Sequence, residues 1–135
     1  MIRIEDGFAP IPREVEEVGK MVVDAIYALH KNLGPGALEK VYQLCLAHEL
    51  SKRGLRFAME VRQPIRYDGL TFEAGYRIDF LVESSVIIEV KAVSFLNPTH
   101  RAQVLNYLKL SGKRLGFLVN FNALTIKTGL RRLIL

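Results

Sequence analysis

The sequence has no tryptophan, only one cysteine among its 135 residues, and no apolar run long enough to cross a membrane. The single cysteine, Cys45, excludes an internal disulfide and fits a reducing compartment. The first seven residues do not read as a secretory signal, so we expect a soluble cytoplasmic protein. No Cys/His spacing typical of zinc sites is present, nor a phosphate-binding loop or dinucleotide fingerprint, which argues against those three chemistries.

The composition is that of an ordinary globular chain, with half of the residues apolar and about a quarter charged. This length predicts one domain spanning residues 1–135, large enough for a core without disulfides. The formal net charge of +5 is compatible with a nucleic-acid partner, although charge alone is a weak signal. For any one cluster of Lys and Arg, a solvated surface is the simpler interpretation.

Apolar periodicity and turn residues divide the chain into expected helices and strands. Helices are expected over 13–32, 37–53 and 98–111, the last with Asn97 as N-cap and Pro98 at the first helical position. Strands are expected over 55–61, 64–67, 70–75, 78–82, 86–93, 115–119 and, at the periphery, within 125–135. The strand–helix–strand unit from Val86 to Val119 favours a parallel crossover, which predicts an α/β fold with a mixed sheet flanked by helices.

Three charged residues interrupt the two apolar strands of a predicted hairpin around Glu83-Ser84-Ser85. Glu89 and Lys91 are two positions apart, so both project from one face of their strand, and Asp79 lies on the neighbouring strand. Charges inside apolar strands are costly unless something compensates them. A divalent cation held by the two carboxylates would do so, because Mg²⁺ prefers oxygen ligands and keeps sites for water and phosphate.

Asp79 followed by Glu89-Val90-Lys91 resembles the active site of the PD-(D/E)XK nuclease superfamily, although Ile78 stands where the superfamily's name has proline. The segment from Gly36 to Tyr42 fits the pattern G-x-x-E-x-x-Y, and the chain resembles the GxxExxY proteins, a branch of that superfamily. The segments 88–93, 100–109 and 118–121 also look like that branch. The resemblance runs from Val15 to Arg132, and several motifs in register are more specific than any one of them.

The resemblance implies a restriction-endonuclease-like fold and a metal-dependent nuclease. It implies that Asp79 and Glu89 bind Mg²⁺ or Mn²⁺, with Glu39 as a third carboxylate and the main-chain carbonyl of Val90 as one more ligand. Lys91 would position the attacking water or stabilise charge at phosphorus. Gln103 would help to arrange the site from the helix that follows.

Each of these assignments has a structural alternative. Glu39 lies in the first turn of its helix, where the helix dipole favours a carboxylate without any catalytic role. Tyr42 lies on an apolar helix face and is more often a core residue. Asp79, Glu89 and Lys91 together could form a structural ion-pair network at a strand end.

The predicted function is therefore hydrolysis of phosphodiester bonds in nucleic acid by metal-activated water, with DNA favoured over RNA. A homodimer would suit cleavage of two strands. The alternative is a nucleic-acid-binding or protein-interaction module that keeps a nuclease fold without cleaving, because fold does not fix function.

Overall fold

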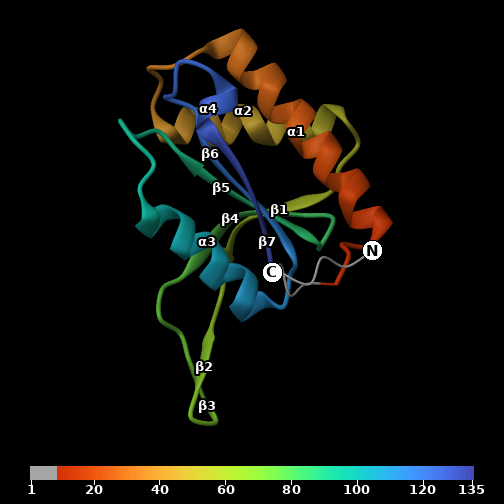
Figure 1. Cartoon of the computed structure of the whole chain (residues 1–135), viewed down its shortest axis with the longest axis vertical. Helices are drawn as coiled ribbons and strands as arrows, with labels where there is room; N and C mark the ends of the chain where they lie inside the picture. Colours follow the sequence, from red (N-terminus) through yellow and green to blue (C-terminus); the bar gives the residue numbers. More distant parts are fainter. Residues whose placement is uncertain (1–8) are drawn as a thin grey trace.

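The computed structural model describes residues 9–135, which form four helices and seven strands (Figure 1). In chain order they are α1 (Arg13–Leu33), α2 (Glu39–Lys52), β1 (Phe57–Arg62), β2 (Ile65–Tyr67), β3 (Leu70–Phe72), β4 (Arg77–Val82), β5 (Val86–Lys91), α3 (Pro98–Ser111), β6 (Leu115–Asn120), α4 (Ile126–Gly129) and β7 (Leu130–Ile134). None of the described helices has a stretch long and apolar enough to cross a membrane.

The main sheet has five strands in the order β1-β4-β5-β6-β7. Strands β5 and β6 are parallel and are joined through α3, whereas the other neighbouring strands are antiparallel. The predicted α/β fold, a mixed sheet flanked by helices, is confirmed. Strand β6 is buried along its whole length, as its continuous apolar sequence predicts for a strand covered on both faces.

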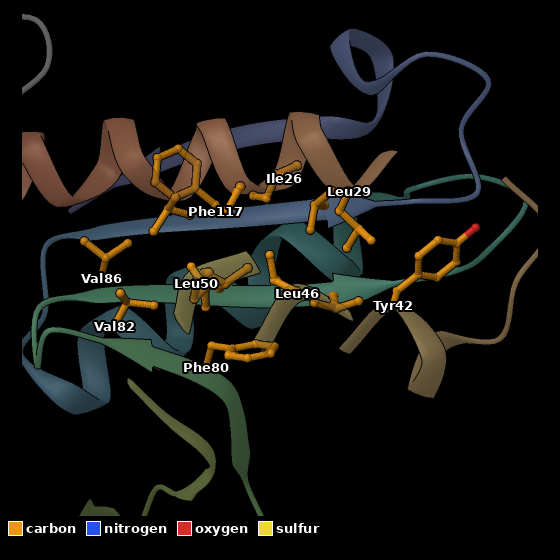
Figure 2. Close-up of a cluster of buried hydrophobic side chains, with 14 of the residues drawn as sticks. Ile26, Leu29, Tyr42, Leu46, Leu50, Phe80, Val82, Val86 and Phe117 are labelled. Carbon is orange, nitrogen blue, oxygen red and sulfur yellow. The ribbon is translucent and has the colours of Figure 1, made fainter. Parts of the chain in front are cut away.

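Helices cover both faces of this sheet (Figure 1). The larger core lies under α1 and α2, where Ile26, Leu46 and Leu50 pack against Phe80 and other alternate residues of the central strands (Figure 2). The smaller core lies under α3, whose Val104 and Leu108 pack against Ile87 and Leu118. Because side chains alternate between faces along a strand, Glu89 and Lys91 share the α3 face with Ile87.

Helix α3 begins at a capping box that the Asn97-Pro98 signal only partly predicts. The Asn97 side chain accepts hydrogen bonds from the backbone N–H groups of Thr99 and His100, at 2.9 and 3.2 Å. The His100 ring accepts one in return from the Asn97 N–H, at 3.2 Å. This exchange fixes the start of the helix directly after the loop that follows β5.

The structure differs from the sequence-based expectation in two segments. The strand expected over 70–75 ends at Phe72, and β2 and β3 form a separate two-stranded hairpin that projects from the body (Figure 1). Within 125–135, where a peripheral strand was expected, the chain first forms the short helix α4. The strand itself, β7, covers only Leu130–Ile134 and pairs with β6. In both segments the sequence pattern is short. Tertiary contacts, which such a pattern does not contain, decide where the paired strands begin and end.

Candidate active site

Strands β4 and β5 separate at the positions of Asp79 and Glu89. Their paired register ends at Phe80 opposite Ile88, whereas β4 remains paired with β1 as far as Arg77 and β5 remains paired with β6 as far as Lys91. Two adjacent strands inside a sheet thus open into a gap at one end. Asp79 and Glu89 lie where this gap begins.

Side chains replace backbone partners in the gap. The Val90 N–H donates to Oδ2 of Asp79 at 2.8 Å, and the Asp79 N–H makes a longer contact with Oε1 of Glu89 at 3.4 Å. Each carboxylate therefore accepts from the backbone of the opposite strand. This reciprocal arrangement fixes both acids and satisfies N–H groups that the separation of the strands leaves without ladder partners.

Lys91 lies beside these carboxylates, with its Nζ 3.5 Å from Oε2 of Glu89. The side chains of Glu89 and Lys91 are only 5% and 18% exposed. A partly desolvated ammonium next to two acids partly offsets the cost of burying them. It also places a positive point charge with three N–H donors at the edge of the gap.

Burial and nearby negative charges make both carboxylates hard to ionise. Desolvation, followed by the charge of Asp79, raises the pKa of Glu89 to about 7, against the lowering effect of Lys91. Desolvation also raises the pKa of Asp79, although the Val90 N–H lowers it. Two acids that resist ionisation in one gap are the arrangement that a bound cation would relieve.

Helix α3 contributes Gln103 and Tyr107 to the same region. The Gln103 amide donates to the Tyr107 hydroxyl at 3.3 Å, as expected for residues four apart on one helix face. Desolvation, with the charges of Glu89 and Asp79, raises the pKa of Tyr107. The tyrosine ring is buried and contacts the Tyr76 ring edge-on, so Tyr107 links the core under α3 to the two acids.

Glu39 is the first residue of α2 and is exposed. Its charge contributes to the raised pKa of Asp79, so its carboxylate lies within electrostatic reach of the gap. Within residues 9–135, however, no three His, Cys, Asp or Glu side chains are grouped closely enough to form a ready-made metal site. The acids of the gap are thus Asp79 and Glu89, with Glu39 approaching from the helix.

Tyr42 explains how the start of α2 is held. Its ring is buried and stacks on Phe121, with ring centroids 4.8 Å apart. Its hydroxyl donates to the Gly34 carbonyl at 2.6 Å and accepts from the Ala37 N–H at 3.1 Å. The tyrosine therefore ties the turn before α2 to the end of β6, and this turn determines where Glu39 lies.

Asn120 was not singled out by the sequence analysis, although it is one of few buried polar residues. It pairs in register with Lys91 on the neighbouring parallel strand. Its amide oxygen accepts from the Val93 N–H at 3.0 Å, and its amide nitrogen donates to the Val93 carbonyl at 2.9 Å. A polar residue at the end of an otherwise apolar strand was the signal that could have revealed it.

The comparison with protein families agrees with this geometry. Residues 16–133 match the model of the PD-(D/E)XK nuclease superfamily. The chain belongs to this superfamily. Members generally use divalent metals, and the two carboxylates supply oxygen ligands that suit such an ion.

A solved structure supports the fold. The chain is similar to the crystal structure of SSO0001, with a TM-score of 0.54 and 22% sequence identity. The match covers 90% of this chain and 59% of that one, so this chain spans about three fifths of the length of its structural relative. A search of functionally curated proteins found no match.

Among the site residues predicted from the sequence, Asp79, Glu89 and Lys91 lie together in the gap. Val90 is joined to them through its N–H, and its side chain is buried in the opposite core. Gln103 is connected to this group by its hydrogen bond to Tyr107, whose pKa is raised by burial and by the charges of Glu89 and Asp79. Glu39 approaches from outside the gap.

Proposed function

We propose that this member of the PD-(D/E)XK superfamily is a divalent-metal-dependent nuclease that hydrolyses phosphodiester bonds of DNA, or alternatively of RNA. The observation that carries the proposal is the pair of carboxylates from Asp79 and Glu89 in the opened sheet, with the Lys91 ammonium 3.5 Å from Glu89. A purely structural ion pair would need only one acid per base, and it would not explain a second partly buried acid with a raised pKa.

Asp79 and Glu89 would hold Mg²⁺ or Mn²⁺, and Glu39 would add a third carboxylate when substrate and ion are present. On an extended strand the N–H and C=O of one residue face the same neighbour. Because the Val90 N–H is directed to Asp79, the Val90 carbonyl also faces the gap, which supports its assignment as a further ligand. The ion would supply charge neutralisation at the phosphate and a lower pKa for a bound water.

The chain's own residues would orient the reaction. Lys91 would donate to the attacking water or to a phosphate oxygen and stabilise the negative charge that develops there. Gln103 would position groups at the edge of the gap through its bond to Tyr107. The backbone contacts of Asp79 and Glu89 would keep the acids in place, so little reorganisation would be needed when substrate binds.

We further propose that the chain is a single domain of the GxxExxY branch that acts in the cytoplasm, and that a homodimer cuts two strands. The structure supports the branch through the contacts of its signature residues: Tyr42 ties down the turn that precedes Glu39. The single cysteine supports a reducing compartment.

The test is cleavage of duplex, single-stranded, flapped and four-way-junction DNA, and of RNA, in Mg²⁺ and in Mn²⁺. Asp79→Asn and Lys91→Ala proteins, shown to be folded by circular dichroism, would be compared with Lys31→Ala, which removes an exposed lysine on α1. We expect cleavage by the parent protein and by Lys31→Ala, and a loss of at least about 100-fold in the other two.

Cleavage that persists in Asp79→Asn and Lys91→Ala would show a contaminating nuclease. A purified protein that binds these substrates without metal and cuts none of them would instead be a non-cleaving binding module on a nuclease fold.

A further inference from the structure

Two large apolar side chains stand out at the end of the sheet where Lys91 lies. Phe95 is 83% exposed and Leu124 is 86% exposed, the highest values for large apolar residues among residues 9–135. They come from the loops after β5 and after β6, and both loops lie at the same end of the sheet because these strands are parallel (Figure 1). Leaving such side chains in water forgoes the favourable free energy of burying them.

Both side chains line one hollow, of about 500 Å³, together with Arg131. A second hollow, of about 420 Å³, adjoins it, because Leu96 and Arg131 line both. The second hollow adds Arg101 and Arg132, but the Arg132 guanidinium is paired with Glu16 on α1, so the guanidinium groups of Arg101 and Arg131 remain to border the groove. Among the described residues, no acidic side chain lines either hollow.

The guanidinium of Arg131 is held in place. Its Nη1 donates to the carbonyls of Thr128 and Leu130, at 2.8 and 3.1 Å. A guanidinium has five N–H donors in a fixed fork, so these bonds still leave donors that suit phosphate oxygens. Arg101 is exposed on the first turns of α3, whereas Arg132 pairs with Glu16 at 2.6 Å. Arg131 and Arg101 are therefore the better candidates for contacts with a ligand.

The groove lies next to the candidate active site. Phe95 lies in the loop that begins after Lys91, the last residue of β5, and Asn120, which pairs with Lys91, also lines the first hollow. The two Asn120 bonds to Val93 fix the loop between Lys91 and Phe95. The groove and Lys91 therefore lie at the same end of the sheet.

Exposed apolar side chains beside arginines match one ligand class well, which is a polynucleotide with unpaired bases. Arginines hold the phosphates, and an aromatic ring stacks on a base of any sequence. A duplex keeps its bases stacked inside, so it presents phosphates to Arg131 but no base face to Phe95. We propose that this groove binds an unpaired stretch of the nucleic acid next to the cleavage point, which makes the protein selective for single-stranded or branched substrates. This inference rests on the proposed function, because it names that function's substrate class.

The test is binding rather than cleavage, measured by fluorescence anisotropy in EDTA with the full chain. The probes are a labelled single-stranded DNA, an RNA of the same sequence, and the corresponding DNA duplex. The variant is Phe95→Ala combined with Leu124→Ala, and its matched control is Tyr27→Ala combined with Leu44→Ala. The control removes exposed apolar side chains from α1 and α2, which cover the opposite face.

We expect the Phe95/Leu124 double variant to bind single strands about tenfold more weakly and to bind duplex as the parent does. Phe95→Tyr, which keeps a ring that can stack, should bind single strands like the parent. Arg101→Ala should weaken binding to all probes and reduce the salt dependence, relative to Arg13→Ala on α1. A stronger effect on one of the two single strands would identify DNA or RNA as the ligand.

The inference is overturned if the parent protein binds single strands no better than duplex, or if the double variant and its control bind equally. If the parent cleaves nucleic acid in Mg²⁺ and either of these results is found, the proposed nuclease activity is retained and the proposed binding groove is rejected. Binding that depends on Phe95 without any cleavage would leave the groove standing and remove the proposed function.

Discussion

The Asp79 carboxylate accepts a hydrogen bond from the Val90 N–H across the gap between β4 and β5, at 2.8 Å. The acid proposed to bind the metal therefore also joins β4 to β5 by a side-chain hydrogen bond, just beyond the last backbone pair of these strands. This double role matters for any mutational test. A change that removes the carboxylate also leaves a buried N–H without an acceptor.

Asp79→Ala and Asp79→Asn should separate these two roles. The alanine variant should unfold more easily by about 1–3 kcal/mol, because the Val90 N–H loses its partner. The asparagine variant keeps an oxygen acceptor and should lose less stability, while both variants lose cleavage. Urea denaturation beside a cleavage assay measures the two effects. Equal stability of the two variants would show that the bond to Val90 contributes nothing.

The raised pKa of Glu89 should make the metal-free protein less stable as the pH rises. A glutamate with a pKa of 4.5 in the unfolded chain and about 7 in the fold binds its proton more tightly in the folded state. Its contribution to the free energy of unfolding is therefore intact below pH 4.5 and is lost progressively up to about pH 7. The loss amounts to roughly 3 kcal/mol for this shift.

Glu89→Gln should remove this dependence. The variant should match the parent near pH 4.5 and be the more stable protein at pH 8, as urea denaturation in EDTA would show. Glu73→Gln, at an exposed position, serves as the control and should leave the pH profile unchanged. If the parent and Glu89→Gln lose stability in parallel between pH 5 and pH 8, the ionisation of Glu89 is not the cause.

Local pattern predicted the hairpin that carries Asp79, Glu89 and Lys91, the helix that carries Gln103, and the parallel crossover between β5 and β6. These features follow from apolar alternation along strands and from helix-capping residues, and both are patterns of residues close together in the sequence. The opening of the sheet was not predictable in this way. It depends on where the pairing of two strands stops, and strand alternation does not reveal that the Asp79 and Glu89 carboxylates replace backbone partners at that point.

The role of Asn120 and the separation of the β2–β3 hairpin from the main sheet were not predicted, for a related reason, although the hairpin itself was expected from its two strands. The asparagine at the end of the apolar strand β6 marks an unusual position but not its partner, because Val93 lies on a different element. The strand expected over 70–75 fits its sequence, but no third strand continues the β2–β3 pair. Glu39, by contrast, was recognised from its sequence motif. Its position relative to the gap could not be predicted, because it depends on the turn before α2 to which the Tyr42 hydroxyl is bonded.

Glu39→Gln tests whether the exposed helical acid takes part in metal binding. Thermal melting with and without Mn²⁺ should show stabilisation of the parent, and less stabilisation of the variant, because one ligand charge is lost. Glu14→Gln is a matched control, since Glu14 also lies in the first turn of a helix and shares any effect of the helix dipole. Equal Mn²⁺ stabilisation of the Glu39 variant and its control would assign Glu39 a purely helical role.

Asn120→Asp tests whether the loop after β5 must be fixed for Lys91 to work. The aspartate keeps an acceptor for the Val93 N–H, but it replaces the amide donor with an oxygen that faces the Val93 carbonyl. We expect a loss of about 2–4 kcal/mol in the free energy of unfolding, because the site is only 3% exposed and the new carboxylate faces the Val93 carbonyl. Asn106→Asp, at an exposed position on α3, should change stability by less than about 0.5 kcal/mol.

At a temperature where Asn120→Asp remains folded, its effect on cleavage separates positioning from stability. A displaced loop should lower kcat through Lys91, and it should also reduce the affinity for single strands through Phe95, measured in EDTA. A purely structural residue would lower only the fraction of folded protein, so both losses would disappear once activity and binding were scaled to that fraction. That result would show that Asn120 does not position Lys91, whose placement would then depend on β5 alone.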